Sequence, residues 1–153
     1  MTQVGVISDT HGLVRPEALA ALAGADVILH AGDIGAPEVL ERLRAIAPVV
    51  AVRGNNDHGA WADALPETEA VQIDGASIYL LHDVNDLGLD AKAAGFAAVI
   101  CGHSHQPRSE RVGGVLFFNP GSAGPRRFKL PIAVGKLRIR GATVDGELVR
   151  LDG

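Results

Sequence analysis

The stretch VGVISDTHG, residues 4–12, is the part of the chain that most strongly predicts the fold. Its first half, Val4–Ser8, is an apolar run typical of a buried β-strand, and Asp9 and His11 follow directly after it. In open α/β sheets, reactive side chains collect beyond the carboxyl ends of the strands. The stretch therefore predicts an α/β protein with polar chemistry at one edge of a sheet.

The same arrangement recurs along the chain, because most of the other apolar runs also lead into a short polar cluster. The runs cover Val4–Ser8, Val27–His30, Val49–Val52, Ile78–Leu81, Ala98–Cys101 and Val115–Phe118. The clusters are Asp9-Thr10-His11, Gly32-Asp33, Gly54-Asn55-Asn56-Asp57, His82 and Gly102-His103-Ser104-His105. Since each cluster follows a strand-like run, we expect them to converge on one site.

The segments between the first three runs are predicted to be helices. Pro16–Ala23 begins with a proline suited to a first helical turn, and Pro37 can open a second helix over Glu38–Ile46. Alternating strands and helices imply parallel strand pairing. A third helix is predicted over Asp86–Ala94, ended by Gly95.

The second half of the chain has the turn chemistry of antiparallel hairpins. Asp74-Gly75, Gly113-Gly114 and Asp145-Gly146 each lie between β-rich stretches, and such pairs favour the positive φ angles of tight turns. Two packed sheets flanked by helices account for both halves. We expect residues 1–153 to form a single domain.

Composition is consistent with one soluble globular domain. A chain of 153 residues buries roughly 70% of its unfolded surface on folding, enough for a core without disulfides. The single cysteine, Cys101, excludes an intrachain disulfide and a cysteine-rich zinc module, and fits a reducing compartment. We expect a cytoplasmic protein.

No signal peptide or membrane span is expected, because Asp9 and His11 interrupt the first apolar run and no later segment is apolar for long enough. Lysine and arginine number 14 against 18 acidic residues, a formal charge of -4. This balance offers no electrostatic footprint for nucleic acid, so a nucleic-acid partner is not expected.

Taken together, the motifs resemble those of the calcineurin-like metallophosphoesterase superfamily. In size and in the stretches Ser8–Gly12, Gly54–Asp57 and Asn119–Gly121, the chain is similar to the small prokaryotic phosphodiesterase branch. All five metal-binding motifs occur in the family's order between residues 9 and 105. The resemblance implies a four-layer α/β/β/α sandwich, with two mixed β-sheets flanked by helices.

The resemblance also implies the metal ligands. One divalent metal would be held by Asp9, His11, Asp33 and His105, and the other by Asp33, Asn55, His82 and His103. Asp33 would then bridge the two metals. The alternation in Gly102-His103-Ser104-His105 fits this sharing, since metals in two-metal sites lie about 3.5–4 Å apart.

Charge counting favours a small phosphate ester as substrate. Two divalent metals, two carboxylates and a bridging hydroxide leave the site near +1, which attracts an anion, and the hydroxide can attack phosphorus in line. An imidazole-rich ligand set suits transition metals better than magnesium or calcium. We expect manganese, with iron, zinc, nickel and cobalt as alternatives.

The third motif departs from a pattern common in the superfamily. Many members carry a proton-donating histidine directly after the asparagine, whereas this chain has Asn56 there. An amide cannot act as a general acid, so the acid is unassigned and aryl esters should be the best artificial substrates. His58 is either the replacement acid or a loop histidine, and Arg53 either reaches the phosphate or pairs with a carboxylate.

Several other residues carry a structural and a functional interpretation. His30 is interpreted as a core or supporting residue more readily than as a ligand, and Cys101 as a buried, inert thiol. Trp61 borders a substrate pocket or packs in the core. Asn119–Ser122 is predicted to be a turn beside the site. Arg126 and Arg127 face a substrate, a partner subunit or solvent.

The principal hypothesis is a binuclear metal-dependent phosphodiesterase, with Asn55, Asn56, His58 and Arg53 as candidate catalytic residues beside the metal ligands. A phosphomonoesterase or nuclease with the same metals is one alternative, since fold does not fix substrate. A non-catalytic scaffold on the same fold is another alternative, since a retromer subunit within the superfamily looks like such a case. Exposed hairpin edges make a homodimer or homotetramer a further expectation.

Overall fold

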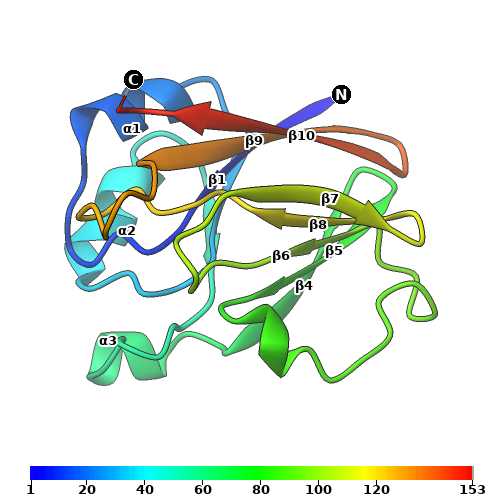
Figure 1. Ribbon diagram of the computed structural model, residues 1–153, viewed down its shortest axis with the longest axis horizontal. Helices are drawn as coiled ribbons and strands as arrows, with labels where there is room; N and C mark the ends of the chain where they lie inside the picture. The colour runs from blue at the N-terminus through cyan, green and yellow to red at the C-terminus, as the bar shows by residue number, and fades with distance from the viewer. Residues whose placement is uncertain (153) are drawn as a thin grey trace.

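The computed structural model describes residues 1–152 and contains two five-stranded β-sheets (Figure 1). In chain order the elements are β1 (Thr2–Ile7), α1 (Pro16–Leu22), β2 (Val27–His30), α2 (Pro37–Arg44), β3 (Val49–Ala51), α3 (Ala60–Asp63), β4 (Thr68–Ile73), β5 (Ala76–Leu81), the 3-10 turn η1 (Val84–Asp86), β6 (Ala98–Ile100), β7 (Arg108–Val112), β8 (Val115–Asn119), β9 (Ala133–Arg140) and β10 (Thr143–Arg150).

Both sheets are mixed, and each has a parallel centre. The first has the order β10-β9-β1-β2-β3, in which β1, β2 and β3 are parallel and β9 and β10 are antiparallel additions. The second has the order β4-β5-β6-β8-β7, in which β5, β6 and β8 are parallel. The parallel pairing predicted for the first three strands is confirmed.

The main core lies between the sheets. Alternate residues of β1 point to opposite faces, so Val4 and Val6 enter this core while Ile7 faces α1 and α2. These two helices cover the outer face of the first sheet (Figure 1). The helix α1 lies so close to β1 that a Cβ on Gly5 would be 2.6 Å from Leu22 Cδ2.

The outer face of the second sheet is covered by η1 and the turns that follow it, and the predicted helix over Asp86–Ala94 is wrong. Asp90 Oδ1 accepts hydrogen bonds from the N–H groups of Lys92 and Ala93, which begins a helical turn there, and Gly95 ends it with a positive φ. Only one turn fits between them. Leu87 and Phe96 of this segment pack on the sheet.

One predicted hairpin turn is also wrong. Asp145-Gly146 lies inside β10, and the chain reverses instead at Gly141, which has a positive φ of 57°. Gly146 is small for a different reason, since a Cβ there would lie 2.8 Å from the ring of Phe118 in the other sheet. The turns predicted at Asp74-Gly75 and Gly113-Gly114 are confirmed.

The architecture is two mixed β-sheets flanked by few helices, which confirms the predicted fold class. In residues 1–152, no helix has the length and apolar character needed to span a membrane. The parallel strands of both sheets matter most for the chemistry, because their carboxyl ends carry the polar clusters.

Candidate metal centre

Loops at the carboxyl ends of five parallel strands meet at one place. Asp9 follows β1, Asp33 follows β2, Asn55 follows β3, His82 follows β5, and the loop of His103 and His105 follows β6. Backbone hydrogen bonds join the loops: Asp9 N–H donates to the Gly32 carbonyl, and His11 N–H donates to that of Asp33. The structure therefore brings together all seven candidate metal ligands.

The backbone at this meeting point is strained. Five of the candidate ligands have left-handed φ angles: Asp9 (55°), His11 (48°), Asp33 (55°), His103 (71°) and His105 (61°). Each such residue costs about 1–3 kcal/mol, and strain of this kind clusters at functional sites because the surrounding structure must maintain it.

Glycines allow the loops to approach one another this closely. A Cβ on Gly102 would lie 2.0 Å from Ser8 Oγ and 2.7 Å from Asp9 Oδ2. A Cβ on Gly54 would lie 2.2 Å from Asp33 Oδ1. Gly102 and Gly54, the first residues of their motifs, therefore leave room for the carboxylate of a neighbouring loop.

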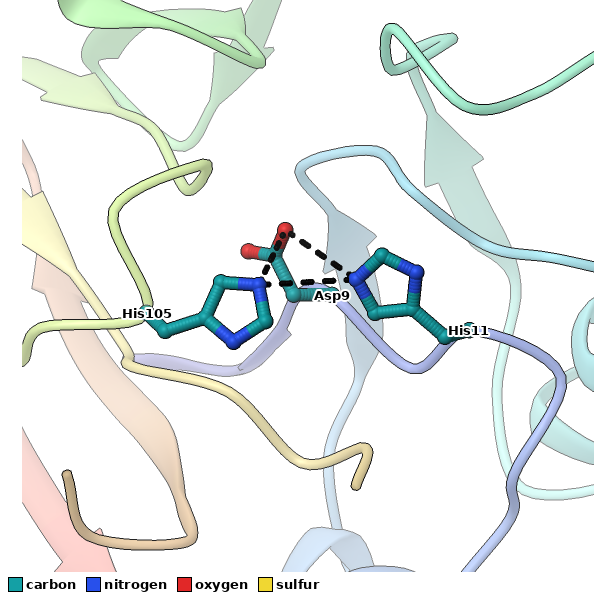
Figure 2. Close-up of side chains that lie close together, drawn as sticks. All are labelled: Asp9, His11 and His105. Atoms are coloured by element: carbon teal, nitrogen blue, oxygen red, sulfur yellow. Dashed lines mark hydrogen bonds and ion pairs between the residues drawn. The ribbon is translucent and has the colours of Figure 1, made fainter. Parts of the chain in front are cut away.

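The first cluster of ligand atoms comes from Asp9, His11 and His105. Figure 2 shows the two imidazoles on either side of the Asp9 carboxylate, each with one nitrogen turned toward it. Asp9 Oδ1 lies 3.4 Å from His105 Nε2 and 3.9 Å from His11 Nε2, and the two nitrogens are 3.4 Å apart. Three donor atoms thus face one point.

The second cluster contains Asp33, His82 and His103. His82 Nε2 lies 3.3 Å from Asp33 Oδ2 and 3.3 Å from His103 Nδ1. Asn55 Oδ1 lies 3.2 Å from the same nitrogen of His103. His82 Nδ1 donates to the Ala31 carbonyl at 2.7 Å, so a neutral His82 turns the lone pair of Nε2 toward the cluster.

The two clusters are contiguous. Asp33 Oδ2, in the second cluster, lies 3.8 Å from His11 Nε2 of the first, and His82 Nε2 lies 3.9 Å from Asp9 Oδ1. This places Asp33 between imidazoles of both clusters, as a bridging carboxylate requires.

Electrostatics keep both carboxylates ionised. Burial opposes this at Asp9, but contact with His105 and the proximity of His82 outweigh it and lower the pKa of Asp9. At Asp33 burial is likewise outweighed by His82 and by the Asn56 N–H, so its pKa lies well below the usual range. Burial lowers the pKa of His82, but Asp33 and Asp9 outweigh it and raise that pKa overall.

Two supporting residues had no assigned role in the sequence interpretation. Asp57 is buried, and its carboxylate accepts hydrogen bonds from the N–H groups of Ile34, Gly35 and Gly54, which ties the loops after β2 and β3 together. Ser8 Oγ donates to Asp9 Oδ2 at 2.8 Å. Asp57 lies in the Gly54–Asp57 motif and Ser8 lies directly before Asp9, and this position in the sequence is the signal that could have identified them.

His30 lies beneath the site and is fully buried. Gly32 N–H donates to its Nδ1, so a neutral ring carries its proton on Nε2, which donates to Thr10 Oγ1 at 3.0 Å. Thr10 Oγ1 in turn donates to the Ile34 carbonyl. Burial lowers the pKa of His30 to about 4, and this neutral, hydrogen-bonded ring braces the loops.

The candidate catalytic residues have different surroundings. Asn56 donates to both oxygens of Asp33, from its backbone N–H at 2.9 Å and its amide at 3.1 Å. His58 is exposed. Arg53 pairs with Glu67 at 2.9 Å and also lines the cavity beside the site.

The other residues with two interpretations from the sequence lie outside the two ligand clusters. Trp61 packs against the hydrophobic cluster under α1 and α2, and burial raises the pKa of the Cys101 thiol to about 11. The Asn119–Ser122 turn borders the site, since Ser122 Oγ donates to the Asp9 carbonyl. Arg126 lies 3.7 Å from Asp152, and Arg127 is exposed.

A cavity of about 340 Å³ opens on the second cluster, where Asn55, His82 and His103 form part of its wall. Small-molecule sites commonly have volumes of about 300–1,000 Å³. Its position means that a ligand held at the metal ligands has room to extend to this side.

The fold and the site together define a metal-dependent phosphoesterase architecture, and comparison with known families agrees. Residues 2–141 match the model of the calcineurin-like phosphoesterase superfamily domain, so the chain belongs to this superfamily. The resemblance inferred from the motifs is thereby confirmed.

Individual relatives span between 78% and 98% of the chain. A probable metallophosphoesterase of Methanothermobacter thermautotrophicus is 35% identical over 96% of this chain and 91% of its own. A phosphodiesterase of Methanocaldococcus jannaschii is 27% identical over 78% of this chain and 82% of its own. The structure of Vps29 from Entamoeba histolytica complexed with Zn²⁺ is 26% identical, with a TM-score of 0.75 over 98% of this chain and 99% of its own.

Proposed function

We propose that residues 1–153 act as one domain, a binuclear metal-dependent phosphodiesterase that hydrolyses a small phosphate ester by in-line attack of hydroxide on phosphorus. The observation that carries the proposal is the donor set at the carboxyl ends of the parallel strands. Two carboxylates and four imidazoles supply two contiguous clusters there, with Asp33 between them.

The residues present fit metal ions. Asp9 Oδ1 is buried and has no hydrogen-bond partner among residues 1–152, although His11, His82 and His105 all turn nitrogens toward it. A buried anionic oxygen without a partner is costly, and a cation between it and those nitrogens removes that cost. This arrangement supports Asp9, His11, Asp33 and His105 as ligands of one metal, and Asp33, Asn55, His82 and His103 as ligands of the other.

Two bound metals would supply a nucleophile at neutral pH and stabilise the charge that develops on the phosphate. The chain's own residues position and orient. Asn56 fixes both oxygens of Asp33, and Ser8 with the His103 N–H fixes Asp9 Oδ2, so Oδ1 is left for the metal. Because the pKa of His82 is raised, a proton competes with a metal for its Nε2, and metal affinity should rise with pH.

The finer assignments rest on the chemistry of the donors. Imidazole-rich ligation favours a transition metal over magnesium or calcium, and we assign manganese, with iron, zinc, nickel and cobalt as alternatives. A cytoplasmic protein fits the single buried cysteine. Four edge strands, β10, β3, β4 and β7, give a homodimer or homotetramer a surface for association, which light scattering can measure.

The decisive experiment compares substrates on protein loaded with Mn²⁺. We expect hydrolysis of bis(p-nitrophenyl) phosphate to exceed that of p-nitrophenyl phosphate, with 2′,3′-cyclic nucleotides as further diester probes. Asp33→Asn should abolish this activity, because both metals lose a ligand, whereas Asp145→Asn, the same change on the exposed face of β10, should retain it.

Faster hydrolysis of the monoester would reassign the protein as a phosphomonoesterase. Turnover of oligonucleotides alone would make it a nuclease. A protein that binds no metal and hydrolyses neither ester would instead support the scaffold alternative.

A further inference from the structure

The cavity beside the second cluster has a strongly acidic wall. Besides the metal-ligand side chains, it is lined by Arg53, Glu67, Thr68, Leu81, Asp83 and Asp86. Three carboxylates stand against one guanidinium, which is a formal charge of -2 with neutral histidines. An acidic wall is unexpected beside a site that attracts phosphate.

The one cation in the wall is already paired. The Arg53 guanidinium lies 2.9 Å from Glu67 Oε1 on one side and 3.9 Å from Asp63 Oδ1 on the other. The backbone N–H of Arg53 donates to the Pro66 carbonyl, which fixes Arg53 beside these two carboxylates. Arg53 therefore offers little free positive charge to a second anionic group of a substrate.

The two aspartates behave differently from each other. Asp83 Oδ1 caps the 3-10 turn η1 by accepting from Asn85 N–H, and its Oδ2 lies 3.7 Å from His103 Nε2. Asp86 is exposed at the end of the same turn, and within residues 1–152 its carboxylate has no hydrogen-bond or ion-pair partner. Asp86 thus leaves an uncompensated negative charge on the wall.

We propose that this cavity holds the ester arm of the substrate and that Asp86 selects among arms by their charge. An arm that carries a small cationic group is preferred to a neutral arm, and an anionic arm is the least favoured. This inference rests on the proposed function, since phosphorus must lie at the metal ligands for the arm to enter the cavity. Leu81 supplies apolar contact for methyl or methylene groups, and Thr68 supplies a hydroxyl. An alkylammonium ester such as a phosphocholine diester has this chemistry.

Two p-nitrophenyl phosphodiesters of the same shape isolate the charge. One has a choline arm and the other has a 3,3-dimethylbutyl arm, so they differ in the charged nitrogen and share the leaving group. We expect kcat/KM of the Mn²⁺-loaded protein to favour the choline ester by about fivefold, the effect of one charge a few ångströms away in water. High salt should reduce this preference.

Variants assign the preference to its source. Asp86→Asn should bring the ratio of the two kcat/KM values close to one and leave turnover of the neutral ester within about twofold. Asp145→Asn, a remote surface aspartate, should leave the ratio unchanged.

Three outcomes would overturn the proposal. Equal kcat/KM for the two esters in the wild type would do so while leaving phosphodiesterase activity established. An unchanged preference in Asp86→Asn would remove Asp86 from the role. Absence of turnover with either ester and with bis(p-nitrophenyl) phosphate would overturn the proposed function, and this inference with it.

Discussion

Asn56 holds the Asp33 carboxylate from two sides, with donors at 2.9 and 3.1 Å on different oxygens. These hydrogen bonds orient the Asp33 carboxylate. Where a carboxylate ligates a metal, removing such a hydrogen-bond partner lowers metal affinity by about 10–100-fold.

Asn56→Ala should therefore weaken Mn²⁺ binding by at least about tenfold, because Asp33 loses its side-chain donor and can rotate away from the metals. Isothermal titration of chelator-treated protein measures this. His58→Ala, which alters an exposed side chain two residues along, is the matched control and should bind Mn²⁺ as the wild type does. Equal affinities in all three proteins would contradict the orienting role.

His58→Ala also tests the proton-donor hypothesis. If His58 protonates the leaving group, the variant should lose activity on alkyl esters and keep it on p-nitrophenyl esters, which leave without a proton. The exposed position of His58 predicts no such difference. A selective loss on alkyl esters would overturn that prediction.

His30 makes the metal-free fold sensitive to acid. Burial lowers its pKa from 6.5 to about 4, so below about pH 6.5 the unfolded chain takes up a proton that the folded chain does not. This contribution to stability is fully present above that pH and is lost as the pH falls toward 4. The loss amounts to about 3 kcal/mol.

His30→Gln should reduce the difference in unfolding free energy between about pH 6.5 and about pH 4.5, because the variant has no group to protonate there. Urea unfolding of chelator-treated protein at both values measures it. The same pH dependence in the variant and the wild type would show that His30 does not carry the effect.

At the scale of elements, the loop after β6 packs against the loop after β1 only because residue 102 lacks a side chain. Gly102→Ala would place a Cβ 2.0 Å from Ser8 Oγ, so we expect a loss of about 1–3 kcal/mol in stability together with weaker metal binding. Gly88→Ala is the matched control, because a Cβ there meets nothing within 4 Å. Equal melting temperatures would mean that the loops can separate without cost.

The sequence predicted most of the elements that carry the site. Apolar runs and prolines located β1, β2, β3, α1 and α2 to within two residues at each end, since strand burial and helix starts are local properties. The helix predicted over Asp86–Ala94 is wrong, because the sequence pattern does not reveal that the Asp90 side chain begins a single turn in the middle of the segment.

Other features depend on contacts between distant segments. Asp145-Gly146 predicted a turn, yet Gly146 pairs within β10, and it is small because the ring of Phe118 occupies the space that a side chain would fill. The motifs indicated which residues gather at the site. The roles of Asn56 and Asp57 depended on hydrogen bonds across loops, which no spacing encodes.

At the scale of the whole molecule, the proposed metal ligands come from both sheets. Asp9, His11 and Asp33 come from the first sheet, and His82, His103 and His105 come from the second. Metal ions held between them should cross-link the sheets and stabilise the fold, because the unfolded chain does not assemble the ligands.

Saturating Mn²⁺ should therefore raise the melting temperature by roughly 10 °C at a thousandfold excess over the dissociation constant. Differential scanning fluorimetry with and without chelator measures the shift. Asp33→Asn should lose most of it, because Asp33 contacts both ligand clusters. If Mn²⁺ did not change the melting temperature of the wild type, this would contradict a metal site between the sheets.

The most direct test of the binuclear assignment is the activity of chelator-treated protein as Mn²⁺ is added in known ratio, with bis(p-nitrophenyl) phosphate as substrate. We predict that hydrolysis rises until about two metal ions are bound per chain and then stays constant, because both clusters must be filled. A plateau at a single metal ion, or no hydrolysis at any ratio, would contradict a binuclear phosphodiesterase.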